Sequence, residues 1–229
     1  MASELLKTPG VCLRIHPWSR TSHVVSWLTP EGRLSTVVKG AVRPKSAFLG
    51  QYDLNYTCEV VYYARGVGEA RALRECAPLA FRSPLRDDWR AFALSDRFRR
   101  LAELLAPSGR EALDWFALLS SSLDALAELA ENRAKTPENY ISSLLVFEMK
   151  ALSLAGLQPG IAPEGGVFSL RGERKMPVSP AVAACLADPA AEKNLKILLD
   201  AARAIGVYYT FHLDYASEGR RQLLAMIAQ

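Results

Sequence analysis

The 229-residue sequence has little of the chemistry on which most enzyme sites depend. It contains three histidines, His16, His23 and His212, and none of them stands in an H-E-x-x-H or H-x-E pattern. No G-x-S-x-G nucleophile motif occurs, and the only G-x-G, within residues 65–69, lacks a third glycine and a following helical pattern. We therefore expect a protein that is not an enzyme. An active site assembled in space from distant residues is the alternative that sequence leaves open.

The sequence is also poor in cysteine patterns that bind metals or form disulfides. Its four cysteines, Cys12, Cys58, Cys76 and Cys185, are far apart and form no C-x-x-C pair. This spacing favours neither a zinc site nor a disulfide framework, and it is typical of buried, small apolar side chains. We expect no metal and no cofactor.

Long hydrophobic runs are absent as well. No apolar stretch approaches the ~20 residues that a helix needs to span a bilayer. The first ten residues, MASELLKTPG, lack the apolar core of a signal peptide. Because 50% of the residues are hydrophobic and 23% are charged, the composition is that of a globular protein with a core. These features predict a cytoplasmic protein, with no membrane association, of one large or two modest domains.

Acidic residues are scarce in one part of the chain. Residues 1–46 hold seven of the 28 basic residues but only two of the 24 acidic ones, so this part carries +5 and the remainder −1. The segment KGAVRPKSAFLGQY, residues 39–52 and hereafter the basic loop, has three cations and no carboxylate. Such an excess suits a polyanion, and nucleic acid before a membrane, because no basic amphipathic helix accompanies it. A merely solvated surface is equally compatible with the charge alone.

Short alternating runs separated by turns occupy the first 80 residues. In residues 10–16, GVCLRIH, apolar and polar side chains alternate with the period of a β-strand. Four more runs of this kind follow, at residues 23–28, 34–40, 56–64 and 70–76. The short connections predict antiparallel neighbours, and five strands of this length predict a small closed barrel. A sandwich fragment or an SH3-like barrel is the alternative.

Helical spacing replaces this pattern from about residue 84 onward. Three long helices are predicted over residues 87–106, 110–135 and 136–156, and two more around 190–206 and 215–228. Thr136 is placed to cap the third helix, with Pro137 at its first position and Gly156 after its end. Residues 157–180 read as an irregular segment. We predict an α+β protein, with a β domain over residues 1–80 and a helical domain over 81–229.

The basic loop is the most distinctive candidate site. Gly40 and Gly50 bracket it and Pro44 stiffens its middle, so its cations are held on an excursion from the barrel where they can contact phosphates. Nearby aromatic side chains could stack on bases, although Trp27 fits the barrel core better and Phe48 could equally close the end of the barrel. The predicted DNA-binding residues are Arg14, Trp18, Arg20, Arg33, Lys39, Arg43, Lys45 and Phe48.

Two segments resemble a known family. Residues 21–54, TSHVVSWLTPEGRLSTVVKGAVRPKSAFLGQYDL, resemble the N-terminal motif of the bacterial RecO family of DNA recombination mediators. The matching residues are Gly32, Lys39, Gly40, Arg43, Lys45, Ser46 and Gly50. Residues 144–159 resemble the family's helix that ends in Gly-x-x-Pro, through Phe147, Glu148, Leu152, Gly156 and Pro159. The order of the parts agrees with the family along nearly the whole chain.

The resemblance implies an N-terminal OB-fold of five strands followed by an all-helical domain. It implies a non-enzymatic protein that binds single- and double-stranded DNA, anneals complementary strands and helps to load a recombinase on DNA coated with single-stranded-DNA-binding protein (SSB). The implied partners are DNA, the recombination protein RecR and the acidic, hydrophobic C-terminal tail of SSB, with no small-molecule substrate. The alternative is a protein–protein adaptor without DNA affinity.

The sequence departs from the family at one point and leaves another open. Many members carry a four-cysteine zinc motif after the Gly-x-x-Pro block, whereas residues 160–180 contain no cysteine. The C-terminal HLDYASEGRRQLL only loosely resembles the family's basic C-terminal helix. An SSB tail needs an apolar pocket with cations beside it, and the sequence does not select among the arginines of the helical domain. These candidates are Arg97, Arg99, Arg100, Arg203, Arg220 and Arg221.

Overall fold

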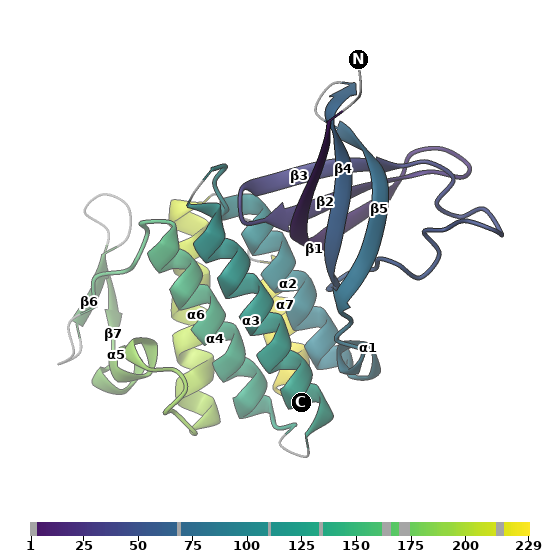
Figure 1. Cartoon of the computed structure of the whole chain (residues 1–229). Helices are drawn as coiled ribbons and strands as arrows, with labels where there is room; N and C mark the ends of the chain where they lie inside the picture. Colours follow the sequence, from purple (N-terminus) through teal and green to yellow (C-terminus); the bar gives the residue numbers. More distant parts are fainter. Residues whose placement is uncertain are drawn as a thin grey trace. The chain divides into compact units, whose positions relative to one another are not determined.

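The computed structural model describes residues 4–67, 70–109, 111–132, 135–161, 166–169, 175–213 and 218–229 (Figure 1). Its backbone divides into two compact units. The first unit consists of residues 1–83 and 95–125, and the second of residues 84–94 and 126–229. Each unit is therefore built from two separate segments of the sequence.

Five strands of the first unit form a closed barrel. They are β1 (Leu5–Pro17), β2 (His23–Thr29), β3 (Gly32–Val38), β4 (Thr57–Val67) and β5 (Ala70–Ala80). The strands follow one another around the barrel in the order β1-β2-β3-β5-β4 (Figure 1). The long strand β1 pairs with β4 through residues 5–11 and with β2 through residues 11–17. The predicted five-stranded OB-fold barrel is confirmed.

One strand pairing differs from the prediction of antiparallel neighbours. Strand β3 does not pair with β4, the next strand in the sequence, but runs parallel to β5 through residues 35–37 and 70–72. The connection between β3 and β4 contains the basic loop, so it is long enough to carry the chain away from β3 before β4 begins. The parallel pair closes the barrel and leaves no open edge between β3 and β5.

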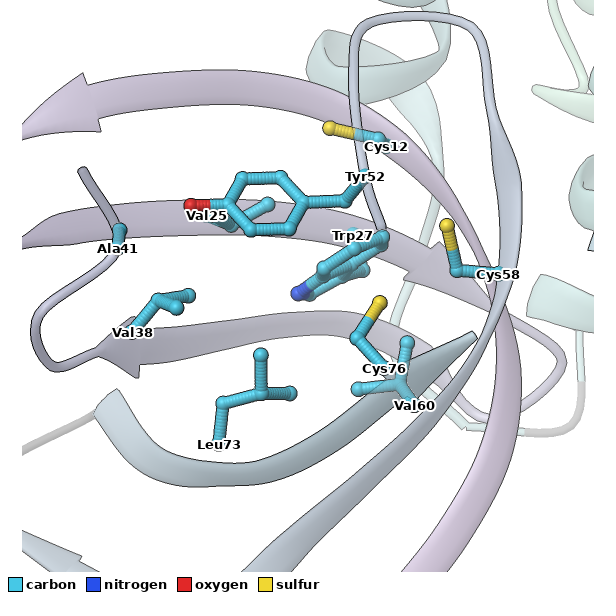
Figure 2. Packing of buried hydrophobic residues seen from close by; sticks show 10 residues of the cluster. All are labelled: Cys12, Val25, Trp27, Val38, Ala41, Tyr52, Cys58, Val60, Leu73 and Cys76. Atoms are coloured by element: carbon cyan, nitrogen blue, oxygen red, sulfur yellow. The ribbon is translucent and has the colours of Figure 1, made fainter. Parts of the chain in front are cut away.

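The barrel interior is filled by side chains from all five strands and from the basic loop. Figure 2 shows ten of them, including Trp27 from β2 and Tyr52 from the basic loop. Trp27 is fully buried, and its Nε1 donates a hydrogen bond to Thr36 Oγ1 at 2.8 Å, which satisfies the one polar atom of the indole. The core interpretation of Trp27 is thus confirmed.

The cysteines are buried, as the sequence predicted. Cys12, Cys58 and Cys76 lie in the barrel core, and Cys185 is buried in the second unit. Burial raises the pKa of the Cys12 thiol far above its usual range. Because only the thiolate is a good nucleophile or metal ligand, this cysteine acts as a packing residue.

A polar network joins the barrel to residues 95–125 within the first unit. Arg82 donates hydrogen bonds to Asp124 Oδ1 and to the Asn55 carbonyl, both at 2.7 Å. The Asn55 side chain donates to Ser95 Oγ at 3.0 Å and accepts from Arg99 Nε at 2.8 Å. Asn55 and Arg82 both have positive φ, 69° and 51°, a conformation that costs roughly 1–3 kcal/mol for a residue other than glycine. The hydrogen bonds of this network hold both residues in this backbone conformation.

Seven helices occur in the part of the chain that the structure describes. They are α1 (Pro84–Asp87), α2 (Trp89–Leu105), α3 (Ala112–Glu131), α4 (Pro137–Leu154), α5 (Pro180–Ala187), α6 (Leu195–His212) and α7 (Glu218–Ile227). The three long helices and the two C-terminal helices were predicted, whereas the short helices α1 and α5 were not. In the segment predicted to be irregular, strands β6 (Gly166–Ser169) and β7 (Lys175–Val178) form an antiparallel pair. Residues 162–165 and 170–174 of that segment lie outside the described residues.

Local capping residues define two of the helix starts. Thr136 accepts a hydrogen bond from the Asn139 amide at the start of α4, and Gly156, with φ of 67°, follows its end as predicted. Asp88 caps α2 by accepting from the amides of Arg90 and Ala91 at 2.9 and 3.1 Å. Burial raises the pKa of Asp88, but the hydrogen bonds from Tyr140 and these two amides outweigh it and hold the pKa below its ordinary value. The cap is therefore a charged, acceptor-only carboxylate at neutral pH.

A buried ion pair joins three helices of the second unit. Arg220 of α7 donates to both carboxylate oxygens of Glu148 on α4, at 2.9 and 2.6 Å, and the two side chains are 2% and 0% exposed. The third nitrogen of Arg220 donates to the Ala202 carbonyl of α6 at 2.6 Å. Gly206, also on α6, leaves room for this guanidinium, because a Cβ there would lie 2.9 Å from Arg220 Nη1. Arg220, a candidate for partner binding from the sequence, is thus committed to the core.

No helix among the described residues is both long enough and apolar enough to cross a bilayer.

Candidate nucleic-acid interface

The β1–β2 turn and the basic loop are held side by side by hydrogen bonds from backbone amides. At the end of β1, the Trp18 amide donates to the Ser22 carbonyl at 2.8 Å and closes the turn. Val42 of the basic loop then donates to the Thr21 carbonyl at 3.2 Å, and the Gly40 amide donates to Ser22 Oγ at the same distance. These bonds place Trp18 next to the first half of the basic loop.

The basic loop itself is built from consecutive turns. The Arg43 amide donates to the Gly40 carbonyl at 3.1 Å, and the Ser46 amide donates to the Arg43 carbonyl at 2.9 Å. Gly40 has φ of 69°, and a Cβ at this position would lie 3.2 Å from Arg43 Cδ. A glycine is needed here because the backbone is left-handed and the Arg43 side chain folds back over the turn.

Apolar side chains anchor both ends of the basic loop in the barrel. Ala41 and Tyr52 are buried in the core (Figure 2), and Tyr52 Oη lies 2.8 Å from His23 Nδ1. Phe48 is half-buried and packs against the same core. Phe48 therefore packs against the end of the barrel, which is one of the two roles that the sequence allowed for it. The cations of the loop are exposed to solvent.

Three of the predicted DNA-binding residues line one shallow depression. Trp18, Lys39 and Arg43 form its walls, and its volume is about 480 Å³. The remaining lining residues are Ser19, Thr21, Ser22, Val37 and Gly40. Trp18 is 65% exposed, which is unusual for so large an aromatic side chain. The depression thus presents an exposed indole and two cations at one end of the barrel.

The other predicted residues fall into two groups. Arg20 and Lys45 are exposed. Within the described residues, no carboxylate oxygen lies within 4.0 Å of their charged nitrogens, and the same holds for Lys39 and Arg43. Arg14 and Arg33 instead contact Glu103 near the end of α2. Arg14 forms an ion pair with the Glu103 carboxylate at 2.5 Å, and Arg33 donates to the Glu103 carbonyl at 3.1 Å.

Comparison with known proteins supports the family resemblance. The chain is 26% identical over 158 residues to the DNA repair protein RecO of Alkaliphilus metalliredigens, a match that covers 68% of this chain and 60% of the relative. It is 28% identical over 155 residues to the RecO of Cutibacterium acnes, covering 66% and 61%. The resemblance to the RecO family is confirmed. The RecO of Salinibacter ruber is 25% identical over 159 residues, covering 69% and 58%.

The chain spans about 60% of the length of the RecO relatives that it matches. No family model matches the chain. Residues 160–180, where the resemblance implied a four-cysteine zinc motif in many members, contain no cysteine. In the described ranges, no group of three or more His, Cys, Asp and Glu side chains is arranged to hold a metal ion.

The second unit contains an apolar cleft of about 580 Å³ between the end of α4, residues 158–161 and α5. It is lined by Met149, Lys150, Ser153, Gln158, Pro159, Ile161, Ala183, Ala184, Leu186 and Ala187. Lys150 is the basic residue of this lining, and it was not among the arginines considered from the sequence. Of those, Arg203 pairs with Asp200 at 2.7 Å and Arg100 pairs with Asp96 at 2.6 Å.

Proposed function

We propose that this chain is a cytoplasmic, non-enzymatic DNA repair and recombination mediator that binds single-stranded DNA at the depression lined by Trp18, Lys39 and Arg43. The observation that carries the proposal is that an exposed indole lies beside two cations, neither of them paired with a carboxylate among the described residues, on the rim of an OB-fold barrel. OB-folds commonly bind oligonucleotides through this part of the barrel, where the loop between the first two strands emerges. The relatives named DNA repair protein RecO point to the same process.

Each part of the depression has a physical role in this proposal. Lys39 and Arg43 contact phosphates and release the counterions condensed on the strand. Trp18 stacks on a base, a contact worth ~1–3 kcal/mol that tolerates any sequence. Arg20 and Lys45, which are exposed nearby in the same two segments, extend the track for the backbone. Phosphate contacts of this kind also give affinity for double-stranded DNA.

Strand annealing follows from the same electrostatics and needs no catalytic residue. Two complementary strands repel each other, and a cationic surface that neutralises their phosphates lowers the barrier to their encounter. We expect the protein to speed annealing of complementary oligonucleotides roughly tenfold at ~50 mM salt, with the gain disappearing as salt rises. The measurement is the rate of fluorescence quenching between a labelled strand and its complement. Unchanged annealing at protein concentrations that saturate the strands would contradict the proposed role.

For the partner side of the function, we propose that the apolar cleft of the second unit binds the C-terminal tail of SSB. The tail is acidic and ends in apolar residues, so it needs an apolar pocket with a cation at its margin. The cleft offers such a lining, with Lys150 beside Met149 and Leu186. Through this contact the protein would assist loading of a recombinase on SSB-coated DNA, with RecR as a further partner.

A cleft-filling variant tests this second part. Ala184 is exposed and lines the cleft, so Ala184→Trp combined with Lys150→Glu is expected to weaken binding of a labelled SSB-tail peptide about tenfold, since it blocks the apolar pocket and reverses the charge at its margin. Lys196→Glu, an exposed charge reversal that does not line the cleft, is the control. Fluorescence anisotropy of the peptide gives both affinities. Equal affinity of the two variants for the peptide would show that the tail does not bind in this cleft.

A further inference from the structure

One carboxylate of the first unit lies on the barrel among the predicted DNA-binding residues. Glu103, in the last turn of α2, forms the ion pair with Arg14 of β1, and its side chain is 23% exposed against 46% for Arg14. The Glu103 backbone carbonyl also accepts the hydrogen bond from Arg33 of β3. Glu103 therefore bonds to two of the eight residues that were predicted from the sequence to bind DNA.

The contact falls on the face of the barrel that OB-folds use for ligands. Arg14 of β1 stands opposite Ser26 of β2, which stands opposite Ser35 of β3. This row crosses the outer side of strands 2 and 3, the surface on which OB-folds bind oligonucleotides. A polar pocket of about 380 Å³ lies here, lined by Leu13, Ser26, Trp27, Arg33, Leu34, Ser35, Glu103 and Ser108.

The segment that carries Glu103 is fastened to the barrel at its far end. The Gly109 amide donates to the Glu31 carbonyl at 2.9 Å. At Gly32, the first residue of β3, a Cβ would lie 3.0 Å from Ser108 Cα, so the two backbones are in close contact. Glu103 is thus held over the β1–β3 face from two sides, by α2 and by the turn that follows it.

We propose that Glu103 competes with DNA phosphate for Arg14 and thereby limits how far a bound strand extends along the β1–β3 face. A carboxylate on Arg14 occupies the position that a phosphate oxygen would take, and its charge repels a strand that leaves the Trp18 depression in this direction. Glu103 is in this view an affinity-limiting residue that keeps DNA binding reversible. The inference rests on the proposed single-stranded-DNA binding at the depression.

Glu103→Gln tests the proposal because it removes the charge but keeps the size of the side chain. We expect the variant to bind labelled single-stranded DNA about fourfold more tightly than the wild type at ~50 mM salt. Its plot of log affinity against log salt should steepen by ~0.7, the value for one additional phosphate on a single strand. One phosphate is expected because Arg33 bonds the backbone carbonyl of residue 103, which the substitution leaves in place.

Two further variants separate the local effect from a change in overall charge. Glu59→Gln raises the net charge equally, and it releases Lys7 from an exposed ion pair of 2.8 Å near the other end of β1. An equal gain from Glu59→Gln would overturn the proposal, and so would a gain that persists when Arg14→Gln is added to Glu103→Gln. Loss of the gain in that double variant, with none from Glu59→Gln, is the expected result.

The experiment also distinguishes this inference from the function on which it rests. If the wild type binds single-stranded DNA and substitution of Lys39 and Arg43 weakens it, but Glu103→Gln changes nothing, only the role of Glu103 is overturned. If neither the wild type nor Glu103→Gln binds DNA at ~50 mM salt, both the role of Glu103 and the proposed function are overturned. Thermal unfolding of each variant, followed by circular dichroism, is expected to match the wild type, because exposed ion pairs contribute little to stability.

Discussion

Replacing Lys39 and Arg43 together by alanine is expected to weaken single-stranded-DNA binding roughly 30-fold at ~50 mM salt, since two exposed charge–phosphate contacts of ~1 kcal/mol each are lost. The salt dependence should change as well. Two fewer phosphates make the slope of log affinity against log salt shallower by ~1.4. The loss should be the same for all base sequences, because phosphate contacts carry no sequence information. Fluorescence anisotropy of a labelled oligonucleotide gives both quantities.

The control for this variant removes two cations from elsewhere on the barrel. Lys7 lies on β1 and Arg65 on β4, and Lys7 is ten residues from the Pro17 end of β1 where the Trp18 turn begins. Lys7→Ala with Arg65→Ala lowers the net charge equally and should change affinity by less than about threefold. Lys45→Ala alone should weaken binding roughly fivefold and make the slope shallower by ~0.7, because Lys45 does not line the depression but supplies one phosphate contact on the proposed track beside it. An equal loss from the Lys7 and Arg65 pair would mean that overall charge, not the depression, attracts the DNA.

Replacing Glu148 by alanine is expected to destabilise the second unit by ~3–5 kcal/mol, because it leaves the Arg220 guanidinium buried without its counter-charge. A loss of this size is a large part of the ~5–15 kcal/mol that holds a typical domain folded. It corresponds to a fall in the melting temperature of ~10 °C or more. Thermal unfolding by circular dichroism or calorimetry would measure it.

A double variant shows whether the buried charge is the cause. Glu148→Leu combined with Arg220→Met replaces both ions by apolar side chains of similar size, and it should recover most of the stability that Glu148→Ala loses. If the double variant is as unstable as Glu148→Ala, packing volume rather than charge explains the loss. A Glu148→Ala protein that melts within ~2 °C of the wild type would contradict the role given to the ion pair.

Most of the fold could be predicted because its signals are local. The alternation around Trp27 defines a strand with one face in the core, and Thr136, Pro137 and Gly156 mark the ends of α4 within a few residues of the chain. Helix α5 has equally local signals: Ser179 accepts from the Val182 amide at 3.2 Å, and Pro180 stands at the first position. The run AVAACLA is not predicted as a helix because it is short and follows a segment without regular periodicity.

The features that escaped prediction depend on residues distant in the sequence. The parallel pairing of β3 with β5 is decided by how the barrel closes, not by any residue of β3. In the sequence, Arg14 and Arg33 have no visible partner because they lie on strands β1 and β3, whereas Glu103 lies on helix α2, 89 and 70 residues further along the chain. The alignment of Trp18 with the basic loop rests on a backbone bond from the Val42 amide to the Thr21 carbonyl, which almost any residue can make, and on the Ser22 hydroxyl that accepts from the Gly40 amide.

The candidate site was therefore predicted in its residue types but not in its assembly. The basic loop can be recognised from its composition, since residues 39–52 contain three cations and no carboxylate. Which cations lack a carboxylate partner is a property of the folded barrel. Among the described residues, no carboxylate pairs with Arg20, Lys39, Arg43 or Lys45, and in the proposed function these are the four cations that contact phosphates.

The most direct test of the central claim is the affinity of the wild-type chain for labelled single-stranded DNA, measured by fluorescence anisotropy at ~50 and ~200 mM salt. Four cations that each neutralise a phosphate predict a slope near −2.8 and thus about 50-fold weaker binding at the higher salt. No binding at ~50 mM salt, or binding that salt leaves unchanged, would contradict the account. The basic loop would then be a solvated excursion of the barrel, and the chain would be a protein–protein adaptor.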